Sequence, residues 1–295
     1  MMSGFTSALV LSWRRGTLYL VRRWATRLTL YAILVAWGCI TLYPFLWILL
    51  TSFKSRWEPY HNPFGLPERW LLENYPYAWR TARTGQLANN SFFVAVTSTL
   101  IAMSLAATCA FALSRFRFAG RGLIFSYIIA GLLIPGSTRL VPLVIFTRQL
   151  GLYDKLLGLA LIYAVGAIPF NVFFLVPFMQ TIPREMEEAA IMDGATMWQV
   201  FLRIIVPLSQ PALVTMATFH MLFCWNEYIT ALLLTASPKN WTMPVGMEAL
   251  MQRFGSNYTA FAAAMVLSFI PAILFFIALQ RYVVKGMAAG ALQGL

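Results

Sequence analysis

Six long runs of apolar residues, separated by shorter polar stretches, dominate the pattern of hydrophobic and polar positions along the chain. Each run is close to the length that an α-helix needs to cross the hydrocarbon core of a bilayer, about 20 residues. The pattern therefore predicts an all-α polytopic membrane protein with six spanning helices. Their ranges are about Leu28–Leu50, Phe92–Leu113, Leu123–Phe146, Leu156–Met179, Ala212–Leu234 and Phe261–Leu279.

Prolines fall inside several of these runs. The third run is interrupted by Pro135, Gly136, Arg139 and Pro142. A kink or a break is expected there, because proline removes a backbone donor and clashes with the preceding turn. Pro169 and Pro271 lie inside the fourth and sixth runs. Such prolines are tolerated where neighbouring helices or a cavity satisfy the freed carbonyls, so they mark either simple kinks or a path through the bundle.

Composition agrees with a membrane protein. Apolar residues make up 60% of the 295 positions and charged residues only 11%. A soluble domain of this length needs more charge to cover its surface. The pI near 10.0 would suit a nucleic-acid partner. No nucleic acid is expected, however, because the basic residues lie between apolar runs and do not gather on one soluble face.

Basic residues are concentrated in the short segments on one side of the runs, and this asymmetry predicts the orientation. The segments are 14–27, 115–121, 184–203 and 281–285. The positive-inside rule places these segments, and with them both termini, in the cytoplasm. The predicted division is an N-terminal cytoplasmic segment 1–27, a six-span domain 28–285 and a cytoplasmic tail 286–295. Residues 13–24 are expected to form either an amphipathic surface helix or a disordered stretch.

The longest polar segment, Thr51–Asn90, lies on the opposite side and is rich in Trp, Tyr and Pro. It is predicted to be a compact exterior segment at the aromatic belt of the membrane interface.

Residues that could carry chemistry are sparse. Cys39, Cys109 and Cys224 lie alone inside apolar stretches, without a CxxC pair or a histidine cluster. No HExxH motif or Ser/His/Asp constellation is present, and His220 is expected to be a core residue. A GxxxxGK[ST] phosphate-binding loop is also absent. We therefore predict no catalytic residue, no cofactor and no metal site.

The segment between the fourth and fifth runs, residues 181–207, is polar yet strongly patterned; we call it the elbow. Its first half carries Pro183, acidic residues that favour a helix start and a glycine that favours a helix stop: Glu185, Glu187, Glu188 and Gly194. Thr196 and Gln199 have the spacing of a capping box, and Pro207 is expected to end the second helix. The pattern predicts a helix, a tight turn and a helix at the membrane surface, which serve either as a docking element or as a simple surface loop.

The sequence Glu188-Ala-Ala-x-x-Asp193-Gly194-Ala195, followed by Phe201, Ile204, Pro207 and Pro211, resembles the "EAA" loop of permease subunits from binding-protein-dependent ABC importers. Specifically, the chain resembles the carbohydrate-importer permeases of the maltose-permease type. Three further stretches fit that family: Tyr43–Lys54, Trp225–Tyr228 and Gln280–Gly286. The resemblance covers nearly the whole chain from about Leu28 onward.

In that family the loop docks in a cleft of a separate cytoplasmic ATPase subunit. The resemblance therefore implies ATPase-coupling contacts at Glu188, Ala189, Ala190, Asp193, Gly194 and Ala195. We expect Glu188 to make a polar contact with the partner, the two alanines to pack closely and the glycine to form the turn. Asp193 either contacts the ATPase or caps the second helix.

A carboxylate inside the fifth run, Glu227, is flanked by Trp225 and Asn226. Ionisable groups inside a membrane are unfavourable and usually face a cavity or a partner. Aromatic and amide groups beside an acid suit a sugar, so these three residues are candidates for the substrate pathway. Alternatively, the polar pair forms hydrogen bonds between helices of the bundle.

The resemblance implies one permease half of an ATP-driven importer, for a sugar or an oligosaccharide, in a bacterial inner membrane. Its expected partners are a second permease subunit, two cytoplasmic ATP-binding subunits and an extracytoplasmic solute-binding protein. A secondary transporter or channel is the alternative. That class more often shows an internal repeat of spans with paired breaks, and no such repeat is visible here.

Overall fold

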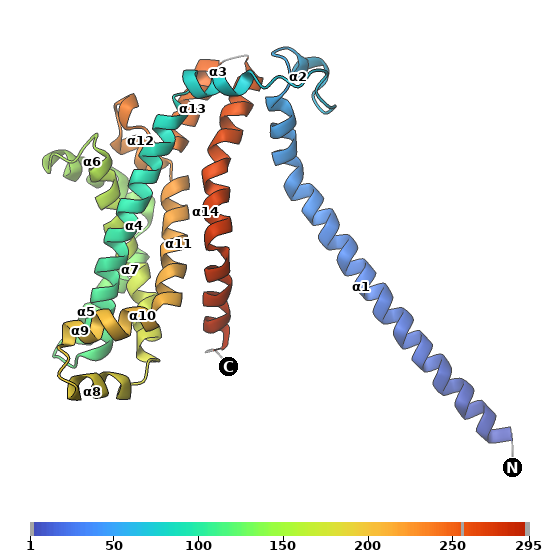
Figure 1. Ribbon diagram of the computed structural model, residues 1–295, viewed down its shortest axis with the longest axis horizontal. Coiled ribbons are helices and arrows are strands. Elements are labelled where there is room, and N and C mark those ends of the chain that lie inside the picture. The colour runs from blue at the N-terminus through green and yellow to red at the C-terminus, as the bar shows by residue number, and fades with distance from the viewer. Residues whose placement is uncertain (1–2, 255–256, 293–295) are drawn as a thin grey trace.

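The computed structural model describes residues 3–254 and 257–292, and these ranges fold into helices without any β-strand (Figure 1). The elements are α1 (Ser3–Ser52), α2 (Glu58–His61), α3 (Asn74–Thr81), α4 (Thr84–Arg115), α5 (Arg121–Ala130), the 3-10 turn η1 (Gly131–Leu133), α6 (Gly136–Gln149), α7 (Leu156–Gln180), α8 (Glu185–Met192), α9 (Met197–Val200), the π-helical turn η2 (Phe201–Ile205), α10 (Val206–Leu208), α11 (Gln210–Asn226), α12 (Ile229–Leu234), the 3-10 turn η3 (Pro238–Asn240), α13 (Met243–Phe254) and α14 (Tyr258–Leu292). The predicted all-α class is confirmed for the described residues.

The centre of the molecule is a bundle in which α4 packs along α7 and α11, and α14 packs against α11 (Figure 1). Ala106 and Ala110 of α4 are fully buried and meet Val172 and Leu175 of α7 in one cluster. Small side chains four residues apart let two helix backbones approach closely, which is how helices associate in membranes without help from water. Close packing of α4 on α7 therefore provides the scaffold for the rest of the chain.

In the part of the chain that the structure describes, three helices are long and apolar enough to cross a membrane: the Thr26–Ser52 part of α1, α4 and α7. Two bent pairs, Arg121–Leu133 with Gly136–Gln149 and Met197–Leu208 with Gln210–Asn226, raise the number to five if each pair is one span. The described apolar part of α14, Tyr258–Leu274, is shorter. The described residues thus contain three to five candidate spans.

The predicted break in the third run is confirmed. The helix direction changes by 101° between the two halves of this run. Ile134 has extended backbone angles (φ −82°, ψ 113°), and Pro135 precedes the first residue of α6. Proline disfavours the helical conformation of the residue before it, so the helix ends at this point.

The fifth run does not form the continuous helix that the apolar pattern predicts. Helix α11 ends at Asn226, Glu227 has extended backbone angles (φ −70°, ψ 128°), and α12 begins only at Ile229. Hydropathy shows that a stretch is apolar, but it does not show that an acidic side chain inside the stretch binds backbone N–H groups and starts a new helix.

Helix α1 continues without interruption across residue 27, the predicted end of the N-terminal segment. Residues 13–24 therefore belong to the helix of the first span and form neither a separate surface helix nor a disordered stretch. The helix leans away from the bundle in Figure 1 and approaches α14 where the rings of Phe45 and Phe269 lie 5.6 Å apart. Leu28 and Trp37 are 74% and 68% exposed. Apolar surface of this extent is unfavourable in water and suits a bilayer.

The long helix α14 also passes the predicted boundary of the sixth span at residue 279 and includes residues 286–292 of the predicted tail. Residues 293–295 of that tail and residues 1–2 of the N-terminal segment lie outside the described residues.

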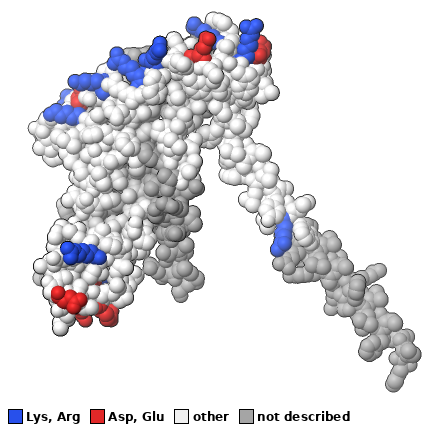
Figure 2. Space-filling model, viewed as in Figure 1, with Lys and Arg blue, Asp and Glu red and all other residues white. Residues whose placement is uncertain are grey.

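Charged side chains gather at the two ends of the bundle and leave its middle almost uncharged (Figure 2). The Thr51–Asn90 segment, with α2 and α3, covers one end. There the buried Lys54 donates to the carbonyl of Asn62 (2.5 Å), and the buried Glu58 accepts from the backbone N–H groups of Ser55 (3.1 Å) and Glu68 (2.8 Å). These bonds explain the compact structure of the segment that the sequence predicts.

A second tether at this end joins the α6–α7 loop to the segment after α12. The Asp154 carboxylate accepts hydrogen bonds from the backbone N–H (2.9 Å) and the hydroxyl of Ser237, and from Nδ2 of Asn240 (3.1 Å). Burial raises the pKa of Asp154, but the hydrogen bonds from these two residues outweigh burial and hold the pKa below its usual range.

Candidate functional site

The first half of the elbow ends as the sequence predicts. Gly194 has a left-handed backbone (φ +85°). Its N–H donates to the carbonyl of Ile191 (3.0 Å), and the N–H of Ala195 donates to the carbonyl of Ala190 (2.9 Å). These two bonds form a Schellman motif, in which glycine is favoured because it lacks a Cβ. A Cβ on Gly194 would meet no atom of this chain within 4 Å, so the glycine also leaves open space beside the turn.

The second half of the elbow begins with the predicted capping box. Oγ1 of Thr196 accepts from the N–H of Gln199 (3.3 Å), and Oε1 of Gln199 accepts from the N–H of Thr196 (2.8 Å). The helix then continues through η2 and α10 to Leu208, one residue beyond the predicted end at Pro207, and bends by 73° into α11. Pro183 precedes the start of α8 at Glu185 by two residues and does not occupy its first turn.

The predicted coupling residues do not all face the same way. Glu188, Ala189, Asp193 and Gly194 are exposed. Ala190 and Ala195 are half-buried and pack against the apolar cluster of this chain's own bundle. Among the hydrogen bonds of the described residues, none joins the Asp193 carboxylate to α9, whose first turn is capped by Thr196. The exposed set, together with the exposed Met192, forms the outer face of the elbow.

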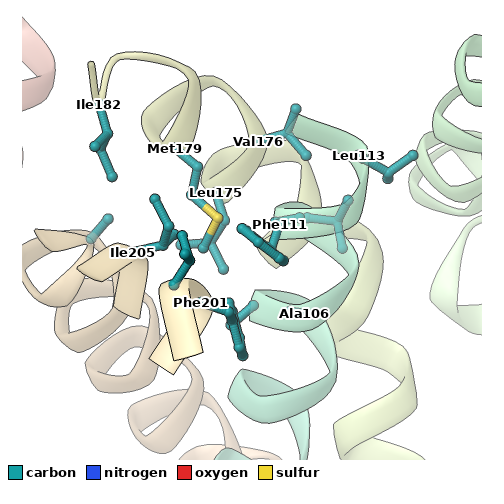
Figure 3. Close-up of a cluster of buried hydrophobic side chains, with 14 residues drawn as sticks. Ala106, Phe111, Leu113, Leu175, Val176, Met179, Ile182, Phe201 and Ile205 are labelled. Atoms are coloured by element: carbon teal, nitrogen blue, oxygen red, sulfur yellow. The ribbon is translucent and has the colours of Figure 1, made fainter. Parts of the chain in front are cut away.

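Below this outer face, an apolar cluster connects the elbow to α4 and α7 (Figure 3). Phe201 of the second elbow helix lies 4.9 Å from the ring of Phe111 on α4 and 5.1 Å from the ring of Trp198. Met179 of α7 and Ile205 of η2 complete the contact and are fully buried. The second elbow helix is therefore packed into the bundle as part of its core.

An ion pair also holds the elbow, and sequence reasoning missed it. Nε of Arg115, the last residue of α4, lies 2.6 Å from Oε1 of Glu187 on α8. Burial raises the pKa of Glu187 above its usual range, although Arg115 and Arg184 beside it act in the opposite direction. The two partners are far apart in the sequence, so no local pattern could have indicated that this glutamate faces inward.

The break between α11 and α12 lies at a different level of the bundle from the elbow (Figure 1), and Glu227 is the extended residue that follows α11 there. Its carboxylate accepts from the backbone N–H groups of Thr230 (2.8 Å) and Ala231 (3.1 Å), which are orphan donors in the first turn of α12. The hydroxyl of Tyr163 on α7 donates to the same carboxylate. Of the polar pair for which the sequence left hydrogen bonding between helices as an alternative, Glu227 makes such a bond.

The other two pathway candidates differ from each other in exposure. Trp225 is buried, whereas Asn226 is exposed and donates its Nδ2 to the carbonyl of Leu222 (2.8 Å). His220 lies 2.8 Å from Oγ of Ser98 on α4, so it is a hydrogen-bonded core residue, as predicted. The break therefore combines one exposed amide with an acid that is engaged within the chain.

The family model described as "Binding-protein-dependent transport system inner membrane component" matches residues 98–289. The diacetylchitobiose uptake system permease protein NgcG of Streptomyces coelicolor is 36% identical over 265 residues, which cover 89% of this chain and 88% of that protein. The trehalose transport system permease protein SugB of Mycobacterium tuberculosis is 33% identical over 255 residues, which cover 86% of this chain and 93% of that protein.

The fold is also similar to a solved structure, a bacterial ABC transporter involved in the import of the acidic polysaccharide alginate. The TM-score is 0.74 at 24% identity, and the match covers 85% of this chain and 94% of that chain. These relatives give no support to a secondary transporter or channel. The chain therefore belongs to the family of binding-protein-dependent transport system inner membrane components, and it is a permease subunit of an ABC transporter and not an enzyme.

Proposed function

We propose that this chain is one permease half of an ATP-driven importer that carries a sugar or an oligosaccharide into a bacterial cell. Two relatives are permeases for diacetylchitobiose and trehalose, and the similar solved transporter imports alginate, so carbohydrate is the solute class that they share. The proposed complex contains a second permease subunit, two cytoplasmic ATP-binding subunits and an extracytoplasmic solute-binding protein.

The proposed topology has six crossings with both termini in the cytoplasm. Three long helices, two bent pairs and α14 supply the crossings. With this orientation the elbow lies on the cytoplasmic side, and the Thr51–Asn90 segment lies outside. In this topology residues 1–27 and 286–295 are the cytoplasmic ends, and residues 28–285 contain the six crossings. These bounds mark sides of the membrane and are independent of where the helices begin and end.

The observation that carries the proposal is the outer face of the elbow. A Schellman turn and a capping box fix its backbone, and its core side is packed into the bundle, yet Glu188, Ala189, Asp193 and Gly194 remain exposed. A rigid, exposed face of small and acidic side chains suits docking into a cleft of an ATPase subunit. Ala190 and Ala195 support this face from below and touch the partner only with their exposed portions.

The proposed solute path passes the break after α11. Irregular backbone at membrane depth is tolerated where it lines a cavity or is buried in protein. Asn226 is exposed there and is the residue that we propose for solute contact. Glu227 and Trp225 shape the path, because the first holds the start of α12 and the second is buried. Closure of the ATPases would move the elbows and rock the spans between outward and inward openings.

Gly194→Asp tests the docking assignment. We expect the variant to insert into the membrane normally but to lose co-purification with the ATPase subunit and solute uptake. An aspartate at this left-handed position costs about 1 kcal/mol of backbone strain and fills the open space beside the turn. Gly120→Asp is the matched control, because Gly120 has φ +84° and equally open surroundings but lies outside the elbow.

Normal co-purification and uptake by Gly194→Asp would contradict the docking assignment. Equal losses of co-purification and uptake in Gly194→Asp and Gly120→Asp would show that backbone strain alone is responsible. That result would also contradict the docking assignment.

A further inference from the structure

Helix α8 presents one buried side chain to the bundle, and that side chain is the carboxylate of Glu187. The Arg115 and Glu187 side chains are only 3% and 9% exposed, and their Nε and Oε1 atoms lie 2.6 Å apart. A helix that rests on a bundle usually buries an apolar stripe. Removing two charges from water is unfavourable unless the geometry and the additional hydrogen bonds are good. A buried pair at this contact therefore calls for a role that an apolar contact would not fulfil.

Besides this ion pair, Arg115 makes a hydrogen bond to the elbow. Its Nη2 donates to the carbonyl of Ile182 (3.0 Å), in the short link between α7 and α8. One guanidinium group thus holds both the start of the elbow and its first helix. The hydrogen bond to Ile182 fixes distance and orientation, and the ion pair with Glu187 adds an attraction between opposite charges, whereas apolar contacts are non-directional and allow sliding. The joint can therefore transmit both a push and a pull.

Helix α4 leads from this joint into the bundle. Arg115 is the last residue of α4, which packs along α7 and α11 over much of its length (Figure 1). Further along the same helix, Oγ of Ser98 lies 2.8 Å from Nε2 of His220 on α11. Helix α11 ends at Asn226, the residue proposed for solute contact. Polar contacts thus form a continuous route from α8 through α4 to α11, the helix that ends at the proposed path.

We propose that Arg115 and Glu187 are positioning residues that transmit the movement of the docked elbow into α4 and so couple ATP hydrolysis by the partner to solute movement. The inference rests on the proposed docking of an ATPase subunit on the elbow. It concerns the inner attachment of the elbow, not the face that touches the ATPase.

The test uses the complete transporter, reconstituted in proteoliposomes, and measures solute molecules moved per ATP hydrolysed. Glu187→Gln removes the charge and keeps the shape. We expect this ratio to fall by about tenfold or more, with unchanged co-purification of the ATPase, since the joint is weakened while the outer face is intact. Arg115→Lys keeps the charge but not the fork, and should give an intermediate ratio. Glu185→Gln is the control, because this exposed acid on the same helix should leave the ratio unchanged.

A double variant, Arg115→Met with Glu187→Gln, is compared with the two single variants Arg115→Met and Glu187→Gln to show whether the two residues act as a pair. If they do, its ratio is no lower than that of the worse single variant, because residues in one interaction have non-additive effects. Full additivity, or a wild-type ratio in assembled Glu187→Gln, would overturn the proposal. If Glu187→Gln does not assemble, Arg115→Lys provides the test instead. A wild-type ratio in Arg115→Lys would then overturn the proposal.

These outcomes separate the inference from the proposed function. If the elbow does not dock an ATPase, Gly194→Asp co-purifies normally with the ATPase subunit. If docking is right but the joint is unimportant, Gly194→Asp loses the ATPase while Glu187→Gln keeps a wild-type ratio.

Discussion

The Glu227 carboxylate holds together three parts of the chain, and its replacement by glutamine tests how the break after α11 is maintained. One oxygen accepts from the N–H of Thr230, and the other accepts from the N–H of Ala231 and the hydroxyl of Tyr163. Glutamine keeps one carbonyl oxygen and places an NH₂ group where the second acceptor stood. That NH₂ group then faces a donor and leaves it without a partner.

The expected loss follows from these bonds. A hydrogen bond to a charged group contributes about 1.5–3 kcal/mol, and a neutral bond contributes about 0.5–1.5 kcal/mol. Glu227→Gln weakens the bonds that remain and removes at least one acceptor, so the free energy of unfolding should fall by about 2–3 kcal/mol. Tyr163→Phe removes a single donor and should lower it by about 1.5–2 kcal/mol.

The assay is a double-mutant cycle on the purified protein in detergent, with the free energy of unfolding measured by denaturant titration and solute uptake measured alongside. The double variant should be less destabilised than the sum of the single variants by about 1–1.5 kcal/mol, because the two side chains share one bond. A coupling energy near zero would refute the structural role. So would unchanged stability combined with a large loss of solute affinity, which would mark Glu227 as a direct solute ligand.

Two further predictions concern the two ends of the bundle. Asp154→Asn should lower the unfolding temperature at pH 7, since the hydrogen bonds from Ser237 and Asn240 favour the charged carboxylate. A group whose pKa is lowered by folding stabilises the protein at pH values above its unfolded pKa, which is about 4 for an aspartate. This stabilisation is lost as the pH falls through the lower, folded pKa. The unfolding temperatures of the variant and the wild type should therefore converge as the pH falls below about 4. Phe201→Ala should lower the free energy of unfolding by about 3–5 kcal/mol, as large-to-small changes in packed cores do. Phe64→Ala, at an exposed phenylalanine, should change it by less than about 0.5 kcal/mol in the same denaturant titration, and equal effects of both variants would contradict the packing of the elbow into the core.

The features that the sequence predicted well depend on neighbouring residues. Gly194 stops a helix because of its own backbone freedom, and Thr196 with Gln199 caps the next helix because they are three positions apart. The break at Pro135 likewise follows from the ring of one residue. Each of these causes acts within one turn of helix, so a linear sequence contains all that is needed.

The features that the sequence did not reveal depend on distant partners. Nothing near Glu187 distinguishes it from the adjacent Glu188, yet the first is buried against Arg115 and the second is exposed. At the break, Glu227 binds the nearby N–H groups of Thr230 and Ala231, but its third partner, the hydroxyl of Tyr163, comes from another helix. Hydropathy identified the apolar runs but could not separate a continuous span from two helices joined at an acid. Hydropathy also did not show where α1 begins. The helix starts at Ser3, well before the apolar run that predicted the first span.

The central claim is that the outer face of the elbow meets a cytoplasmic ATPase, and the accessibility of one cysteine tests it most directly. Glu188→Cys would be placed in a chain whose native Cys39, Cys109 and Cys224 have been replaced, with Glu68→Cys at the opposite end of the bundle as the control. A membrane-impermeant maleimide should label only the control in intact cells, and should label Glu188→Cys only in inverted vesicles from which the ATPase has been removed. Labelling of Glu188→Cys from outside the cell, or labelling that the bound ATPase leaves unchanged, would contradict the account.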